Sequence, residues 1–144
     1  MARVRWRWVW GEDDGHLEMD FLDSGLVHVT ASVVRPGHDL VVLDEPDAPA
    51  PRSGMEIRAS GLWADAIEEE PGERWTIGLE AFALAVELPG DSVGRRVPLG
   101  FDLEWERTAP GPGSRTPAHV LGEVLVEDDA LDLDTDGWWE QPHR

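Results

Sequence analysis

Apolar and polar residues alternate at a period of two along most of this chain, and no other feature constrains its fold as strongly. Between Arg3 and Trp10, for example, the tryptophans at positions 6, 8 and 10 fall on one face and the arginines on the other. The helical spacing of i, i+3, i+4 and i+7 hardly extends beyond one turn anywhere. The alternation predicts an all-β protein.

Turn residues between the alternating segments predict about eight antiparallel strands. The expected strands cover residues 4–10, 16–22, 26–34, 39–43, 55–68, 75–87, 97–107 and 118–127. The fifth is expected to bend at Ser60-Gly61. Residues 79–87 also fit a helix, but the β-rich context favours a strand. Such evenly spaced strands indicate a lipocalin-like up-and-down β-barrel or a β-sandwich.

The length of 144 residues predicts a single β domain over residues 1–144. The Pro-rich segment 44–54 is interpreted as an exposed loop, with a lid over a cavity as the alternative. Residues 127–144 are interpreted as an acidic C-terminal tail. Within it, residues 132–137 match the beginning of a calcium-binding loop, but the twelfth position is His143 where a glutamate is needed, so we predict no metal site.

The net charge of −18, from thirty acids and twelve arginines, argues against a nucleic-acid partner, because phosphate contacts need a cationic face. The chain has no apolar run near the roughly 18 residues of a membrane helix and no signal-peptide pattern. We therefore predict a cytoplasmic protein without a membrane partner. The absence of cysteine excludes disulfides and thiolate sites. No cofactor motif is present, so no cofactor is predicted.

Carboxylates lie inside the alternating segments between Gly61 and Glu106. Asp102, Glu104 and Glu106 share the face opposite the large apolar residues of their strand, which is typical of a solvated outer face. Glu80 is different, because it is in line with Phe82 and with other large apolar residues. If these acids point into a cavity, desolvation raises their pKa, and Glu80 or Asp102 becomes a candidate proton donor.

Tryptophans flank these acids and could form the walls of a binding site. Trp63, Asp65, Trp75, Glu104 and Trp105 are the candidate ligand-binding residues, because aromatic faces bind flat apolar molecules and stabilise cations. Simple packing of the tryptophans in the core is the alternative interpretation.

Four segments, GLWADAIEEEPGERWTIGLEAFALAVE, VPLGFDLEWE, HVLGEVLVE and DGWWEQPHR, resemble actinobacterial proteins related to the carotenoid hydratase (hydroxyneurosporene synthase-like) lipocalin-type superfamily. Chains of that superfamily usually contain two lipocalin-like domains, and this chain has the length of one. The resemblance therefore implies either a homodimer or a lone binding module. It also implies acid-assisted hydration or cyclisation of an isoprenoid or polyene.

Three functions follow as hypotheses. The first is a β-barrel that binds a small apolar, isoprenoid- or polyene-like molecule in a Trp-lined cavity. The second is a hydratase or cyclase in which Glu80 or Asp102 donates the proton and Trp75 or Trp105 stabilises the cation. The third is a structural or interaction protein whose barrel is filled with side chains. Fold alone does not choose between them.

Overall fold

A computed structural model of the chain describes residues 4–88, 93–110 and 113–142. All the regular elements in this part are strands: β1 (Val4–Trp10), β2 (Gly15–Phe21), β3 (Leu26–Val33), β4 (Leu40–Pro49), β5 (Glu56–Ala59), β6 (Leu62–Glu70), β7 (Arg74–Val86), β8 (Arg95–Arg107), β9 (Arg115–Val126) and β10 (Asp129–Glu140). The all-β prediction is confirmed. Residues 143 and 144 of the predicted tail lie outside the described part, and so does much of the expected connections at 89–95 and 111–114.

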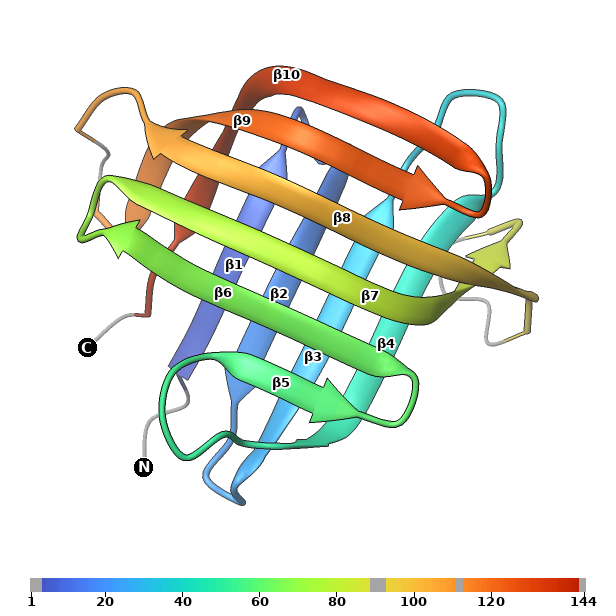
Figure 1. Ribbon diagram of the computed structural model, residues 1–144, viewed down its shortest axis with the longest axis horizontal. Coiled ribbons are helices and arrows are strands. Elements are labelled where there is room, and N and C mark those ends of the chain that lie inside the picture. Colours follow the sequence, from blue (N-terminus) through green and yellow to red (C-terminus); the bar gives the residue numbers. More distant parts are fainter. Residues whose placement is uncertain (1–3, 89–92, 111–112, 143–144) are drawn as a thin grey trace.

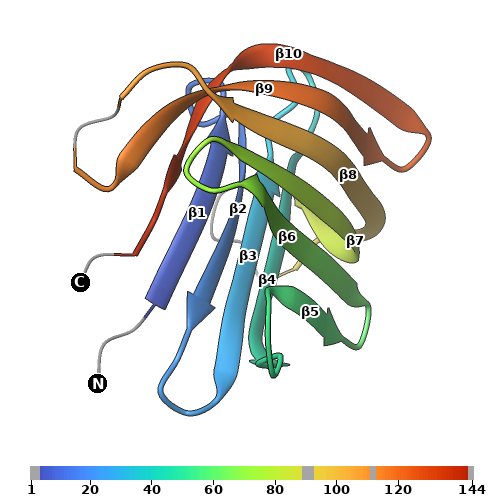
Figure 2. The same cartoon turned by 60° about the vertical axis from the view of Figure 1, so that its left-hand side comes forward.

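The strands form one antiparallel sheet that closes into a barrel (Figure 1). Their order is β4-β3-β2-β1-β10-β9-β8-β7-β6-β5, and a further pairing of β4 with β7 closes a ring of eight strands. The first part of β7 pairs with β6, whereas Leu84–Val86 leave β6 and pair with β4. The β5–β6 hairpin therefore continues the sheet beyond the ring (Figure 2).

Apolar side chains from the inner faces of the strands pack into one core cluster. Trp8, Trp105 and Trp139 are among its largest fully buried members. Trp75 joins them, with its ring centroid 5.2 Å from that of Trp8. These tryptophans are the largest side chains inside the ring, and burial of such large aromatic groups contributes to its stability.

Two predicted boundaries are wrong in the middle of the chain. Residues 55–68 form a hairpin of two strands, because Gly61 adopts a left-handed conformation (φ +73°) and reverses the chain. The predicted loop 44–54 is strand as far as Pro49, because β4 continues to pair with β3. Prolines 46 and 49 are tolerated, since this half of β4 has a strand partner on one side only in the described structure, and Pro46 falls at an irregularity of the ladder.

The predicted acidic tail is also wrong, because residues 129–140 form β10, which pairs with both β9 and β1. Leu131, Leu133 and Trp139 point toward the core, and aspartates 132, 134 and 136 lie on the outer face. The high content of acids led to the prediction of a tail, although these acids alternate with apolar residues at the period of two that is typical of a strand. The described part contains no helix, and so none that is long and apolar enough to cross a membrane. The cytoplasmic location stays a prediction.

Candidate functional site

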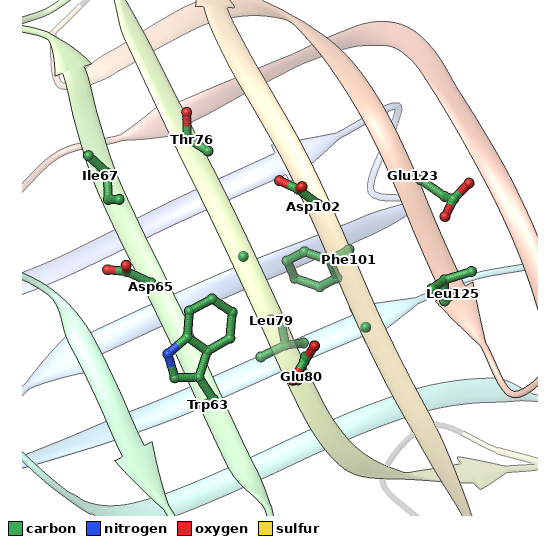
Figure 3. A pocket seen from close by; sticks show the side chains of 12 residues that line it. Trp63, Asp65, Ile67, Thr76, Leu79, Glu80, Phe101, Asp102, Glu123 and Leu125 are labelled. Atoms are coloured by element: carbon green, nitrogen blue, oxygen red, sulfur yellow. The ribbon is translucent and has the colours of Figure 1, made fainter.

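Four of the residues predicted from the sequence surround one hollow on the outer face of the sheet. Trp63 and Asp65 come from β6, Glu80 from β7 and Asp102 from β8 (Figure 3). The hollow has a volume of about 370 Å³ and is also lined by Ile67, Thr76, Gly78, Leu79, Gly100, Phe101, Glu123 and Leu125. It lies on the far side of the sheet from the tryptophan core.

The sheet register arranges these residues in two rows across the strands. One row runs Asp65, Gly78, Asp102, Glu123 and Asp132. The neighbouring row runs Trp63, Glu80, Gly100 and Leu125. Since Gly78 and Gly100 have no side chains, the surface is lowered between their larger neighbours. The Trp63 ring occupies the space above Gly78, and Gly100 forms part of the floor.

Trp63 forms one wall, and two contacts fix its orientation. Its Nε1–H donates a hydrogen bond to Glu56 Oε2 at 3.1 Å, which lowers the pKa of Glu56 together with the neighbouring Arg58 guanidinium. Its six-membered ring lies over Gly78, where a Cβ atom would be 2.9 Å from Trp63 Cη2. The indole therefore presents its ring to the hollow in a defined position.

The hollow contains four carboxylates that are not ion-paired within the part of the chain that the structure describes. Asp65, Glu80, Asp102 and Glu123 form no ion pair with any arginine in the described residues. The arginines form their ion pairs elsewhere, for example Arg58 with Glu56 at 3.1 Å. Desolvation, and then the nearby Glu56 carboxylate, raise the pKa of Asp65. The site therefore favours a positive charge, and no arginine within the described residues supplies it through an ion pair.

Like charges also lie directly opposite one another in the first row. Asp102 pairs in register with Glu123, and Glu123 pairs with Asp132. Directly opposed like charges destabilise an antiparallel pair. Unfavourable pairs of this kind are typical of functional sites, where residues are retained for binding at a cost in stability.

The structure does not bring the remaining predicted residues to this hollow. Trp75 and Trp105 are buried in the core, where they face the interior. Glu104 lies on the outer face, but its carboxylate is 3.6 Å from Arg74 and outside the hollow. Glu80 and Asp102 are exposed, and the whole thickness of the sheet separates them from Trp75 and Trp105. The arrangement needed for a buried proton donor beside a cation-stabilising tryptophan is therefore absent from these residues.

Sequence reasoning missed the floor and one wall of the hollow. Gly78 and Gly100 occur inside strands, where glycine often marks the close approach of a backbone or ligand. These two glycines are the signal in the sequence that could have indicated the floor. Glu123 and Leu125 come from β9, far along the chain. Only the register of β8 with β9 places them beside Asp102 and Gly100.

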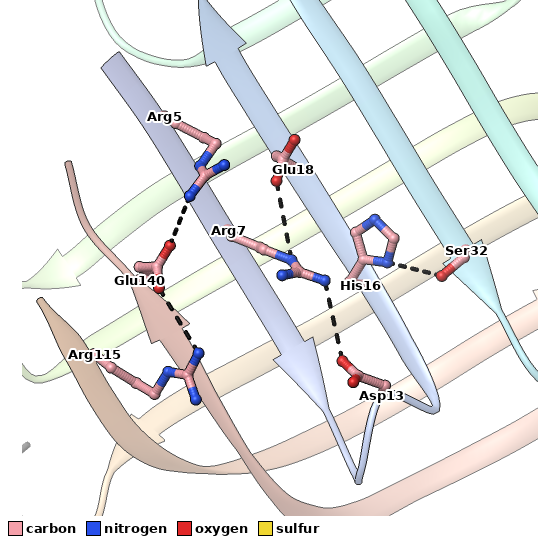
Figure 4. A network of polar contacts seen from close by, with 8 residues as sticks. All are labelled: Arg5, Arg7, Asp13, His16, Glu18, Ser32, Arg115 and Glu140. Atoms are coloured by element: carbon pink, nitrogen blue, oxygen red, sulfur yellow. Dashed lines mark hydrogen bonds and ion pairs between the residues drawn. The ribbon is translucent and has the colours of Figure 1, made fainter. Parts of the chain in front are cut away.

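A second cluster of polar residues lies on the outer face of β1, β2, β9 and β10 (Figure 4). Glu140 lies within 4 Å of both Arg5 and Arg115, while Arg7 pairs with Glu18 and Asp13. Its charges neutralise one another, so we consider it structural. Across the described ranges, no group of three or more His, Asp or Glu side chains could hold a metal ion.

No protein-family model matches the chain, and comparisons with curated proteins and with solved structures also find no match. The resemblance to the carotenoid hydratase superfamily therefore stays a prediction.

Proposed function

We propose that this protein is a binding protein with a filled barrel, and that it holds a small organic molecule in the hollow on its outer face. The molecule would combine an apolar body with one cationic group. The observation that carries the proposal is a set of four carboxylates that surround a Trp-walled hollow and form no ion pair with a described arginine: Asp65, Glu80, Asp102 and Glu123.

The ligand chemistry follows from the lining. An ammonium group near Asp65 and Asp102 would lie between two carboxylates whose backbones are about 10 Å apart, since they are two strands apart in register. The Trp63 ring offers a face for a cation–π contact or for an apolar body. A neutral apolar molecule would use only the second of these contacts, and an anion would be repelled.

Calorimetric titration with 2-phenylethylamine and with 2-phenylethanol tests the proposal, because the two differ in charge and hardly in shape. We expect the amine to bind about tenfold more tightly than the alcohol, and the difference to shrink as salt screens the exposed charges. Equal affinity of the two, or no heat with either, would contradict the proposal.

Matched variants locate the site. Glu80→Gln and Asp102→Asn should each weaken amine binding about threefold to tenfold, because each removes one partly screened attraction. Glu106→Gln is the control, since Glu106 is an exposed carboxylate on the same strand as Asp102 but outside the hollow. If the control weakens binding as much as the two hollow variants, the amine responds to general surface charge and not to this site.

A homodimer is a second candidate, favoured by apolar side chains on the same face. Ile67, Phe82, Leu121 and Leu125 each leave more than two fifths of their surface exposed. A second copy that covered them would bring two acidic faces together, so association should increase with salt. Sedimentation analysis at about 0.05 M and 0.5 M salt tests this, and a monomer in both would contradict it.

A further inference from the structure

A second hollow adjoins the first on the outer face and extends it toward the other end of β7. It has a volume of about 510 Å³, and its lining includes Phe82, Pro98 and Glu127. Trp63, Glu80, Gly100 and Leu125 line both hollows. The two therefore form one continuous groove with Trp63 and Glu80 near its middle.

The two halves of this groove differ in charge. The first half contains Asp65, Asp102 and Glu123, which form no ion pair with any arginine that the structure describes. In the second half, the carboxylate that is not shared is Glu127, and it is ion-paired with Arg95. The walls of this half are mainly apolar, with the Phe82 ring half exposed and Pro98 opposite it in the register.

The Arg96 side chain places a positive charge at the far end of the groove. The guanidinium carbon of Arg96 lies 4.1 Å from the centroid of the Phe82 ring. Arg96 forms no ion pair with a carboxylate within residues 4–88, 93–110 and 113–142. A second ammonium group arriving at this end would be repelled, whereas a hydrocarbon end would contact Phe82 and Pro98.

We propose that the second hollow holds the hydrocarbon chain of the ligand, so that the groove as a whole is built for a single-chain cationic amphiphile with one charged end. This inference rests on the proposed function, because the ammonium group occupies the first hollow. From the Asp102 row to the Phe82–Pro98 row the strands advance four residues, or about 13 Å. An extended chain of about ten carbons spans that distance.

Titration with unbranched primary alkylamines, from butylamine to dodecylamine below micelle-forming concentrations, measures the chain subsite. Affinity should rise about twofold for each methylene, which is less than full burial would give because the groove is open. The rise should end near ten carbons. An α,ω-diamine of eight carbons should bind about tenfold more weakly than octylamine, since its second ammonium meets Arg96 and loses the apolar contact.

Two variants assign the effect to the second hollow. Phe82→Ser should flatten the dependence of affinity on chain length, while the affinity for butylamine stays unchanged. Because Phe82 is half exposed, a serine at this position should be tolerated. Leu121→Ser is the control, because Leu121 is an equally exposed apolar residue on the same face but lines neither hollow. The slope should be retained in this control.

The outcomes separate the two proposals. Binding of butylamine that is sensitive to Asp102→Asn, with no gain for longer chains, would overturn the chain subsite and leave the proposed function standing. A gain with chain length that persists in Phe82→Ser would also overturn it. Absence of binding by every amine would overturn both.

Discussion

Gly78 lies directly beneath the indole of Trp63. The two residues are diagonal neighbours on β7 and β6, and a Cβ atom at position 78 would approach Trp63 Cη2 to 2.9 Å and Cζ3 to 3.0 Å. The absence of a side chain at one position therefore sets the position of the aromatic wall at the other. The hollow depends on this pair as much as on its carboxylates.

Gly78→Ala should displace the Trp63 ring and weaken amine binding severalfold. The loss of stability should be modest, about 1 kcal/mol, because Trp63 is only partly buried and can move outward. Gly100→Ala is the comparison for stability alone, since its nearest contact would be Leu79 O at 3.3 Å and no side chain has to move. It is not a control for binding, because Gly100 lines the hollow. Calorimetry and thermal unfolding of both variants check this. Unchanged amine affinity in Gly78→Ala would contradict the role of the contact.

Gly137→Ala should destabilise the barrel far more than Gly100→Ala. At position 137 a Cβ atom would lie 2.3 Å from Val9 O and 2.7 Å from Val120 Cγ2, between strands that cannot separate without breaking the ring. We expect a loss of about 3 kcal/mol in the free energy of unfolding, against less than about 0.5 kcal/mol for Gly100→Ala. Urea unfolding measures both, and similar losses would contradict the argument.

Trp105→Phe should be more costly than Trp75→Phe, although both remove a buried indole. Trp105 Nε1–H donates a hydrogen bond to Val9 O at 3.0 Å, which the substitution removes. Trp75 Nε1 is buried without a hydrogen-bond partner among the described residues, so its loss removes an unsatisfied donor. We expect a difference of about 1 kcal/mol in unfolding free energy. A larger loss in Trp75→Phe would show that packing outweighs the hydrogen bond.

Histidine 16 should make the folded state less stable as the pH falls from about 6.5 to 4. Burial, reinforced by Arg7, lowers the pKa of His16 from 6.5 to about 4, although Asp13 opposes the shift. The unfolded chain then binds a proton in this window that the folded chain does not, so stability is complete above the unfolded pKa and is lost below it. The change is roughly 2–3 kcal/mol.

A histidine-ring NMR titration checks this directly, with His16→Gln used to identify the signal. The expected midpoint is near pH 4, and the hydrogen bond between His16 Nδ1 and Ser32 Oγ at 2.7 Å should keep the ring in one orientation (Figure 4). A midpoint near 6.5 would contradict the burial of the ring.

Asp65→Asn should raise the melting temperature at pH 7. The pKa of Asp65 is raised in the folded state, chiefly by desolvation, so its ionised form disfavours folding at a pH above that pKa. Asparagine carries no charge and removes this cost. The gain over the parent protein should shrink as the pH is lowered toward the raised pKa of Asp65, because the carboxyl group then becomes protonated. A gain that is constant with pH would point to a cause other than ionisation.

The period-two alternation was sufficient to predict strands and to divide inner from outer faces in the central segments. Trp8, Leu79 and Leu103 are buried, and Glu80 and Asp102 are exposed, in agreement with the alternation of their strands. The apolar residues in line with Glu80 made its face ambiguous in sequence. Phe82 is in fact half exposed, so this apolar residue belongs to the outer surface and not to the core.

The sequence by itself determined the all-β class and the composition of the core, because burial of alternate apolar side chains is a local property of each strand. Tertiary structure decided the rest. Asp65, Asp102 and Glu123 belong to three strands separated by long stretches of chain, and only sheet register places them in one row. Which face of each strand points toward the core is likewise a property of the whole ring, because a strand by itself does not distinguish an inner from an outer face.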